Sequence, residues 1–311
     1  MISDGFIINP YYELLPDYKI CPFQNTDMFI NRSLPLSNSI EDYLSARFYQ
    51  KEYTFTFNAR EAIYLALSVY KLQPEDIVTI FTTTGNFYIS SCVTREIEKF
   101  CRWSRKIETN TKLLFVNHEF GYPYKALHEL TNTGLPVIED CAHSFFSNDE
   151  NEIIGTVGDF VIYSFPKMFP LQIGGLLVSN IHKLTGKRSQ IDDLKLKYLK
   201  NVLSYHLKYE ENIINKRISN YNFLKAKFES LGFAERFNLD KGIVPGVFMF
   251  SSNGLRIDLP ELKKYFYANG VQCSVFYGEE SFFIPVHQGL DEQDMIYFYE
   301  IMRSFMQSIE P

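Results

Sequence analysis

Short apolar runs alternate with segments of helical spacing through the middle of the chain. The apolar runs have the length of strands and lie at 77–81, 112–117, 136–139, 160–164 and 176–178. The helical segments between them include 87–99 and 124–131. Because short continuous apolar runs are typical of strands buried on both faces, the alternation predicts an α/β fold with a mainly parallel central sheet flanked by helices. Such sheets bind ligands at the carboxyl ends of their strands.

The segment before this region predicts a strand, a tight turn and the N-terminus of a helix. Residues 52–57 alternate between apolar and polar positions and favour a strand. Asn58 follows, and the apolar positions after it have helical spacing, so Asn58 is predicted to be an N-cap. Residues 1–50 contain several prolines and predict an irregular entry segment with one helix at about 40–49.

The pattern changes after Asn180 and predicts a division into three parts. Residues 181–230 are polar, rich in lysine and helical in spacing, which indicates one or two long linking helices. We therefore expect a large domain at 1–180 and a smaller C-terminal α+β domain at 231–311. The strands and helices expected in the small domain lie at 244–251, 259–269, 271–276 and 291–306.

Composition and charge exclude several classes of partner. The chain has 311 residues and a net charge of −6, and it contains no basic run, which argues against nucleic acid. No apolar stretch is long enough to span a membrane, and the first residues lack the features of a signal peptide. The five cysteines form no CxxC pair, so we interpret them as reduced thiols of a cytoplasmic protein, without a disulfide or metal site.

Two strand ends carry ionisable side chains that could take part in catalysis or ligand binding. An apolar strand ends in Glu139 and Asp140, which by itself is typical of a solvated strand end but also suits an acid facing a ligand. Lys167 follows another apolar strand, where a lone lysine most often reaches out to solvent. Gly174 and Gly175 then predict a close approach of two backbone segments before the next strand.

Together these residues suit the chemistry of pyridoxal phosphate (PLP). That cofactor needs a lysine for its aldehyde, an acid beside its pyridine nitrogen and hydrogen-bond donors for its phosphate. A helix N-terminus is a good source of phosphate donors. Lys167, Asp140 and the turn at 58–61 would supply these three parts in turn.

Several stretches resemble the DegT-type PLP-dependent nucleotide-sugar aminotransferases of the fold type I superfamily. The strongest resemblance runs through "VIEDCAHS" at 137–144 and "GTVGDFVIYSFPKMFPLQIGGLLVSN" at 155–180. Further similar stretches are "FNAREAIYLAL" at 57–67, "VNHEFGYP" at 116–123, "KRISNYNFL" at 216–224 and "IPVHQGLDEQD" at 284–294. The resemblance implies the fold type I architecture, transfer of an amino group from glutamate or a similar donor to a keto-deoxysugar nucleotide, and a homodimer that makes surface polysaccharide or related sugars.

The resemblance also implies roles for particular residues. Lys167 would form the Schiff base with PLP and move protons as a general acid and base. Asp140 would pair with the pyridine nitrogen, His143 would lie near the phenolic oxygen, and Ser164 would donate to the phosphate.

Ala59 and Arg60 would lie in the phosphate turn and offer backbone N–H groups. Phe87 would stack on the pyridine ring, although an ordinary core position suits it equally well. For His118 a structural role near the site is favoured over a catalytic one.

The chain departs from the common family pattern at several of these positions. Ala59 stands where many members have glycine, Arg60 replaces a small hydroxyl residue, and Ser164 is two residues closer to Lys167 than usual. Two alternatives therefore stay open. One is another PLP-dependent reaction on sugars, such as dehydration, although the closest such relatives have histidine in place of the lysine. The other is a non-catalytic relative with a binding role.

Overall fold

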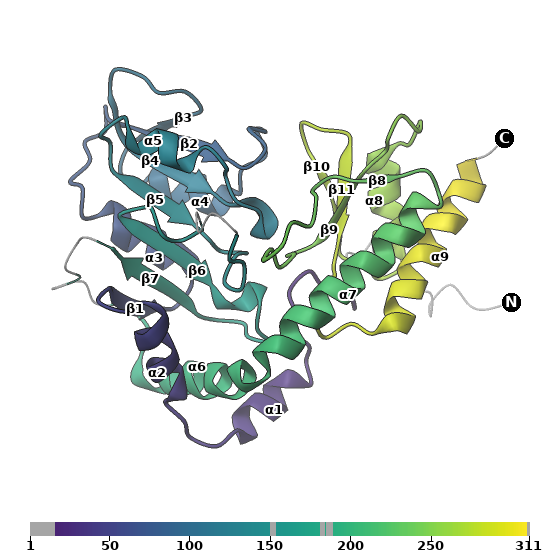
Figure 1. Ribbon diagram of the computed structural model, residues 1–311, viewed down its shortest axis with the longest axis horizontal. Coiled ribbons are helices and arrows are strands. Elements are labelled where there is room, and N and C mark those ends of the chain that lie inside the picture. Colours follow the sequence, from purple (N-terminus) through teal and green to yellow (C-terminus); the bar gives the residue numbers. More distant parts are fainter. Residues whose placement is uncertain (1–15, 150–153, 181–183, 185–188, 310–311) are drawn as a thin grey trace, which may run out of the picture.

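The computed structural model describes residues 16–149, 154–180, 184 and 189–309. The first residues, whose sequence lacks signal-peptide features, lie outside the described part. Two sheets stand side by side, and long helices pass between and beneath them (Figure 1). The part of the chain that the structure describes contains no helix with the length and apolar character needed to cross a bilayer.

The large sheet is mainly parallel, as the alternation predicts. Its strand order is β1-β7-β6-β5-β4-β2-β3, and every neighbouring pair from β6 to β3 is parallel. β7 is antiparallel to both of its neighbours, β6 and β1. The strands are β1 (Glu52–Thr56), β2 (Ile77–Thr82), β3 (Arg102–Ser104), β4 (Thr111–Asn117), β5 (Val137–Asp140), β6 (Phe160–Ser164) and β7 (Gly175–Ser179).

Helices cover both faces of this sheet, which explains why its central strands are continuously apolar. In β4, Leu113 and Phe115 pack on one face into the cluster beneath α3 and α4. The alternate residues Leu114 and Val116 pack on the other face against α5. Because side chains of a strand alternate between faces, both sets need an apolar partner.

The helices include the predicted ones, with some changes at their ends, and a further helix at 27–33 in the segment that was expected to be irregular. They are α1 (Asp27–Ser33), α2 (Ser39–Arg47), α3 (Ala59–Leu67), α4 (Ser91–Ile97), α5 (Leu127–Thr131), α6 (Asp193–His206), α7 (Glu210–Glu229), α8 (Leu259–Ala268) and α9 (Glu292–Ile309). The helix expected at 87–99 begins only at Ser91, because the Ser90 side chain caps it by accepting from the Cys92 N–H.

The turn before α3 has the predicted N-cap. The Asn58 side chain accepts from the N–H of Glu61 at 3.0 Å, and the Glu61 carboxylate accepts from the N–H of Phe57 at 2.6 Å. This pair resembles a capping box, except that Glu61 accepts from the residue before the N-cap, and it satisfies two backbone donors at the helix start. It defines the direction in which the remaining N–H groups of α3 point.

The small sheet has its own core. Its strand order is β10-β11-β9-β8, with all neighbours antiparallel. The strands are β8 (Ala234–Glu235), β9 (Phe248–Ser251), β10 (Ser274–Phe276) and β11 (Ser281–Ile284). The second half of α7 belongs to this core through Tyr221, Leu224 and Phe228. The domain boundaries at 180 and 230 remain a proposal, and α7 packs across the second of them.

The strand expected at 244–251 is shorter than the apolar run that predicted it. It starts at Phe248 as β9, because the backbone of Pro245 and Gly246 is engaged elsewhere. The Pro245 carbonyl accepts from Arg217, and the Gly246 N–H donates to the carbonyl of Phe120 at 2.8 Å. These contacts attach the entry of the small sheet to the large one.

Candidate active site

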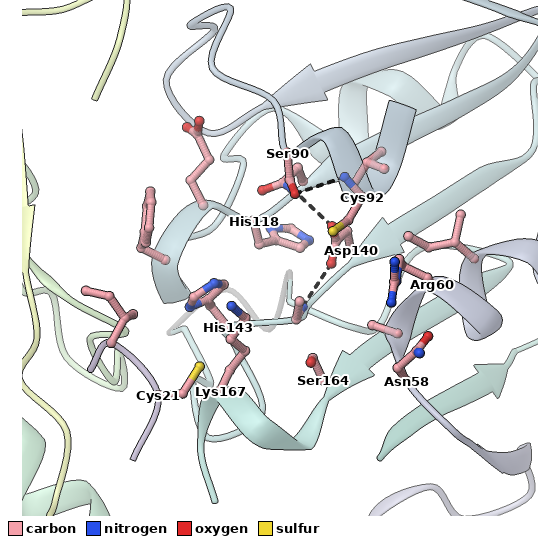
Figure 2. A pocket seen from close by; sticks show the side chains of 18 of the residues that line it. Cys21, Asn58, Arg60, Ser90, Cys92, His118, Asp140, His143, Ser164 and Lys167 are labelled. Atoms are coloured by element: carbon pink, nitrogen blue, oxygen red, sulfur yellow. Dashed lines mark hydrogen bonds between the residues drawn. The ribbon is translucent and has the colours of Figure 1, made fainter. Parts of the chain in front are cut away.

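A cavity of about 400 Å³ lies at the carboxyl ends of the central parallel strands. This is where a ligand is expected in such a sheet, and the volume is within the range of small-molecule sites. Side chains from β4, β5, β6 and α3 form its floor and walls (Figure 2). Its cover includes Ile20 and Cys21 from the N-terminal segment and Gln272 and Phe283 from the small unit.

Asp140 is the last residue of β5 and lines this cavity. Its side chain is 6% exposed, so the carboxylate is almost removed from water. Asn117, its neighbour in the parallel register, donates to it at 3.1 Å, and the Ala142 N–H donates at 3.0 Å. Burial raises the pKa of Asp140, while the hydrogen bond from the Ala142 N–H and the charge of Lys167 oppose that rise. A cationic donor in the cavity would complete its set of partners.

Lys167 and Ser164 come from one short segment after β6. Ser164 ends the strand, and a 3₁₀ turn, η3 (Phe165–Lys167), follows at once. Both residues line the cavity, and Figure 2 shows Lys167 extending into it beside His143. The three-residue spacing therefore brings the lysine and the hydroxyl to the same space as Asp140.

The N-terminus of α3 forms another wall. Asn58, Ala59 and Arg60 line the cavity, and Arg60 lies on the same side of it as Asn58 (Figure 2). Gly175 of β7 allows this approach, since a Cβ there would meet the Ala59 nitrogen at 2.8 Å. The close approach predicted from the paired glycines is confirmed, and it brings backbone donors of a helix N-terminus to the cavity.

His143 and Phe120 form the wall toward the small unit. Their rings are 5.3 Å apart, and Phe120 also contacts the ring of Phe283 at 4.9 Å. Phe120 has φ 54°, a left-handed conformation that is unfavourable for a bulky residue and needs support from its surroundings. Burial and the positive charges of Lys167 and Arg217 hold the pKa of His143 well below its usual range, so His143 is neutral.

The structure does not bring Phe87 into the cavity. Its side chain is 79% exposed in the single chain, while the next residue, Tyr88, lines the cavity. The loop before α4 turns Phe87 outward, where the guanidinium of Arg105 lies 5.9 Å from its ring. Asn117 and Gln272 line the cavity without having been expected there. Asn117 follows an apolar strand as Asp140 does, and that position was the available signal.

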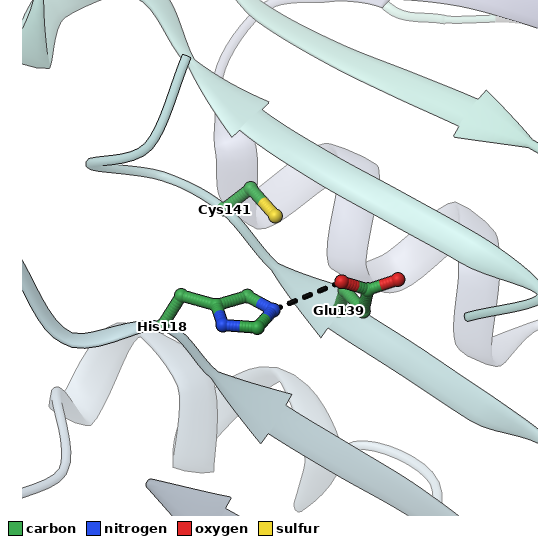
Figure 3. A group of neighbouring side chains, drawn as sticks. All are labelled: His118, Glu139 and Cys141. Atoms are coloured by element: carbon green, nitrogen blue, oxygen red, sulfur yellow. Dashed lines mark hydrogen bonds and ion pairs between the residues drawn. The ribbon is translucent and has the colours of Figure 1, made fainter. Parts of the chain in front are cut away.

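A buried group of three ionisable side chains adjoins the cavity, and one of them, His118, also lines it. Ligand atoms of His118, Glu139 and Cys141 all lie within 4.8 Å of one another, in a geometry that resembles a metal site (Figure 3). His118 Nδ1 accepts from the Tyr124 N–H at 3.1 Å, so Nε2 must be the donor to Glu139 at 2.9 Å. Burial raises the pKa of the Cys141 thiol well above its usual value.

Backbone donors fill the remaining acceptor positions of Glu139. Its carboxylate accepts from the N–H groups of Gly155, Val157 and Gly158 at 2.7, 2.9 and 2.6 Å. With the His118 bond, four donors reach one fully buried side chain. The group is therefore a structural brace, which supports the structural role expected for His118.

The cavity residues fit pyridoxal phosphate in the chemistry of their donors and acceptors. Asp140 has room for a cationic donor, Lys167 offers an amine, and the α3 N-terminus with Arg60 offers donors to an anion. Gly246 leaves space beside His143, because a Cβ there would lie 2.8 Å from His143 Nδ1. Small, polar and cationic groups thus stand where a flat, anionic aromatic ligand would need them.

Known proteins are similar to this chain in sequence and in fold. GDP-perosamine synthase of Escherichia coli O157:H7 is 32% identical over 123 residues, which cover 37% of this chain and 32% of that protein. The chain thus matches about a third of that relative's length. An aminotransferase structure, TlmJ from Streptoalloteichus hindustanus, has a TM-score of 0.73 at 16% identity and covers 91% of this chain and 95% of its own.

Two further structures share the fold at low identity. A DegT DnrJ EryC1 StrS aminotransferase from Brucella abortus has a TM-score of 0.69 at 14% identity, over 90% of this chain and 93% of its own. The GDP-4-keto-6-deoxy-D-mannose-3-dehydratase of E. coli has a TM-score of 0.67 at 12% identity, over 93% and 100%. These likenesses confirm the fold type I architecture. Residues 40–245, more than half of the chain, match the family described as "Putative PLP-dependent aminotransferase". The chain belongs to this family of PLP-dependent aminotransferases.

Proposed function

We propose that this enzyme transfers an amino group from glutamate, or a similar amino donor, to a ketone of a nucleotide-linked deoxysugar. One observation carries the proposal: Lys167, Asp140 and the N-terminus of α3 all line the same cavity. They come from three separate parts of the chain and supply the three kinds of group that PLP chemistry needs. Their convergence is hard to explain for a strand-end lysine that merely reaches for solvent.

When bound, PLP supplies an electron sink for the substrate carbon next to nitrogen. Asp140 would hold a proton on the pyridine nitrogen, because a buried carboxylate with two donors has capacity for a cationic third. Lys167 Nζ would accept and return the proton that moves between the substrate carbon and the cofactor carbon. His143, kept neutral by burial and nearby positive charge, would donate to the phenolic oxygen or accept from it.

The phosphate would be bound at the start of α3. The backbone N–H groups of Ala59 and Arg60 have no helical partner at that position, and the helix dipole favours an anion there. Arg60 would add a positive charge, and Ser164, which lies beside Asn58 in Figure 2, would donate its hydroxyl. We propose no contact between Phe87 and the pyridine ring of the cofactor.

The sugar part of the proposal rests on the similarity to GDP-perosamine synthase. That similarity covers a third of the relative, and the proposal therefore names only the class of substrate, a nucleotide-linked deoxysugar. Production of surface polysaccharide is part of the same proposal.

The test begins with the cofactor. PLP added to the purified protein should give a visible absorption band. Borohydride reduction followed by mass spectrometry should place the cofactor on the peptide that contains Lys167. Lys167→Ala should abolish both signals, with an unchanged circular dichroism spectrum as the control for folding. The proposal fails if the wild-type protein gives no band and no labelled peptide.

The reaction type is tested with a ketosugar nucleotide and glutamate. Transamination yields 2-oxoglutarate in an amount equal to the aminated sugar. A deoxygenated sugar instead would indicate dehydration, the reaction in the name of one structural neighbour. Firm binding of PLP without turnover of any amine would favour a binding role.

We also propose a homodimer in the cytoplasm. Several large apolar side chains are exposed on α1 and at the start of α6, including Phe29 at 74%, Ile30 at 49% and Leu194 at 81%. Exposed large apolar side chains of this kind are typical of residues that an interface between copies covers. Light scattering should give twice the mass of 36.4 kDa for one chain.

A further inference from the structure

Arg217 is a buried cation that the proposed chemistry does not use. It lies on α7, and its side chain is 0% exposed. Among the residues that the structure describes, it forms no ion pair with a carboxylate. Burial lowers its pKa to about 10, so it still carries its charge at neutral pH. Removing a charge from water without a counter-ion is costly, so the contacts that replace water must matter for the fold or the site.

The guanidinium bonds to three separate segments. Nη2 donates to the carbonyl of Lys167 at 2.9 Å, and Nη1 donates to the carbonyl of Pro245 at 3.2 Å. Nε donates to the side-chain oxygen of Gln288 at 2.9 Å. These partners lie 50, 28 and 71 residues away along the chain. One side chain thus joins the lysine turn, the entry to the small sheet and the loop before α9.

Gln288 also bonds to the lysine turn, which is η3 (Phe165–Lys167) together with Met168. Its amide nitrogen donates to the carbonyl of Met168 at 2.8 Å while its oxygen accepts from Arg217. The carbonyls of two consecutive residues, Lys167 and Met168, are therefore held by one arginine–glutamine pair. The turn also bonds to itself, because the Met168 N–H donates to the Phe165 carbonyl at 2.9 Å.

These contacts decide where the lysine side chain points. The direction of a Cα–Cβ bond follows from the peptide planes on its two sides, and η3 is only three residues long. A short 3₁₀ turn has poor hydrogen-bond geometry of its own, so outside contacts carry much of its stability. Arg217 and Gln288 supply them from α7 and from the small unit, which α7 connects to the large sheet (Figure 1).

We propose that Arg217 and Gln288 are positioning residues, which orient Lys167 Nζ into the cavity by holding the two carbonyls of its turn. The inference rests on the proposed role of Lys167. The position of the lysine would then depend on how the small unit packs against the large one, since Gln288 lies between Val286 and Leu290 of the small unit's core. A small displacement of such a group costs much reactivity, because covalent attachment needs near-attack geometry.

The test compares variants of Arg217 and Gln288, here called the clamp, with a control variant on the same helix as Arg217. Arg217→Met removes all three bonds, Gln288→Leu removes two, and Arg217→Lys keeps the charge but has a single donor nitrogen. Tyr221→Phe is the control, because Tyr221 lies one turn along α7 and bonds to the Phe237 carbonyl at 2.6 Å, away from the lysine turn. The measurements are the rate and equilibrium constant of PLP attachment, followed by borohydride trapping and mass spectrometry, and the melting temperature.

We expect Arg217→Met and Gln288→Leu to weaken PLP attachment by about tenfold or more, in the range observed for loss of a supporting hydrogen bond around a reactive group. Arg217→Lys should recover part of that loss. Tyr221→Phe should lower the melting temperature and leave attachment unchanged. If Arg217→Met does not fold, Gln288→Leu and Arg217→Lys decide the question.

Two outcomes overturn the inference, and they are distinguishable. Clamp variants that attach PLP as the wild type does, or that lose attachment only in proportion to their loss of stability, would show a purely structural role and leave the proposed function intact. A wild-type protein that attaches no PLP would overturn the proposed function as well.

Discussion

Two consecutive acids at the end of β5 have opposite environments. Glu139 and Asp140 are both buried, at 0% and 6% exposure, and they point to opposite faces of the strand. Glu139 accepts from His118 and from three N–H groups in the 155–158 loop. Asp140 accepts from two donors and faces the cavity that contains Lys167.

The number of hydrogen-bond donors that reach each carboxylate distinguishes Glu139, which has a structural role, from Asp140, which belongs to the site. A buried carboxylate is tolerated when hydrogen bonds replace its lost hydration. Glu139 has a full set from the protein itself, so it has no capacity left for a ligand. Asp140 has an incomplete set on the side of the cavity, where a cationic ligand would complete it.

The largest effect is expected from Asp140→Ala. Turnover should fall by about 100-fold or more, roughly 3 kcal/mol of barrier, since the acid beside the cofactor nitrogen is lost. Stability should change little, because the buried carboxylate is a cost that the variant removes along with its two bonds. The measurement is turnover with saturating PLP, with thermal unfolding as the control. Wild-type turnover in this variant would contradict the assignment of Asp140.

Glu139→Ala should show the reverse pattern. The free energy of unfolding should fall by about 3 kcal/mol, because several buried donors lose their acceptor at once. PLP attachment, measured on the folded fraction, should stay within about twofold of the wild-type value. Urea denaturation at pH 7 checks the first expectation. If this variant instead loses turnover while keeping its stability, the distinction between the two acids is wrong.

Glu119 is a third buried acid and tests the same rule through pH. One of its oxygens accepts from the Thr84 N–H at 2.8 Å, and the other has no hydrogen-bond partner among the described residues. Burial raises its pKa to about 7 from the ordinary 4.5. The folded protein therefore keeps this proton in a range where the unfolded chain has lost it. Stability should fall as pH rises from 4.5 to above 7.

Glu119→Gln removes that dependence and keeps an acceptor for Thr84. At pH 8 the variant should be more stable than the wild type by about 2 kcal/mol, and at pH 4 the two should be close. Urea denaturation at both pH values measures the difference. Equal stabilities at pH 8 would mean that Glu119 ionises in the folded protein without cost.

The smallest effects are expected at Phe87 and Tyr88. These two consecutive residues also differ, because Tyr88 lines the cavity and Phe87 does not. Phe87→Ala should change stability by less than about 0.5 kcal/mol and leave PLP attachment unchanged, since the side chain is 79% exposed. Tyr88→Ala should weaken attachment several-fold, because Tyr88 lines the cavity and packs on Phe276 at 5.1 Å. A PLP titration of both variants is decisive. A strong effect of Phe87→Ala would restore its predicted role in stacking.

The fold was predictable wherever the signal was local. The apolar runs, the Asn58 cap and the two glycines each specify structure within a few residues, and the structure has the expected strands and the expected turn there. The hydrophobic pattern predicted the wrong strand bounds where backbone groups bond to residues far away in the chain. The stretch at 244–251 is apolar enough for a strand, yet Arg217 and Phe120 engage the backbone of its first residues.

The sequence by itself determined the α/β class and the segment that brings Ser164 and Lys167 together, because each depends on residues close in the chain. It indicated the cofactor through the types of residue at separate strand ends and through the family resemblance. Only the tertiary structure decided which acid of β5 faces the cavity with an incomplete set of hydrogen-bond donors. It also decided that Phe87 points away, and that Arg217 and Gln288 hold the lysine turn. Hydrogen bonds between residues 50 or 120 positions apart depend on how whole elements pack, and periodicity carries no information about that packing.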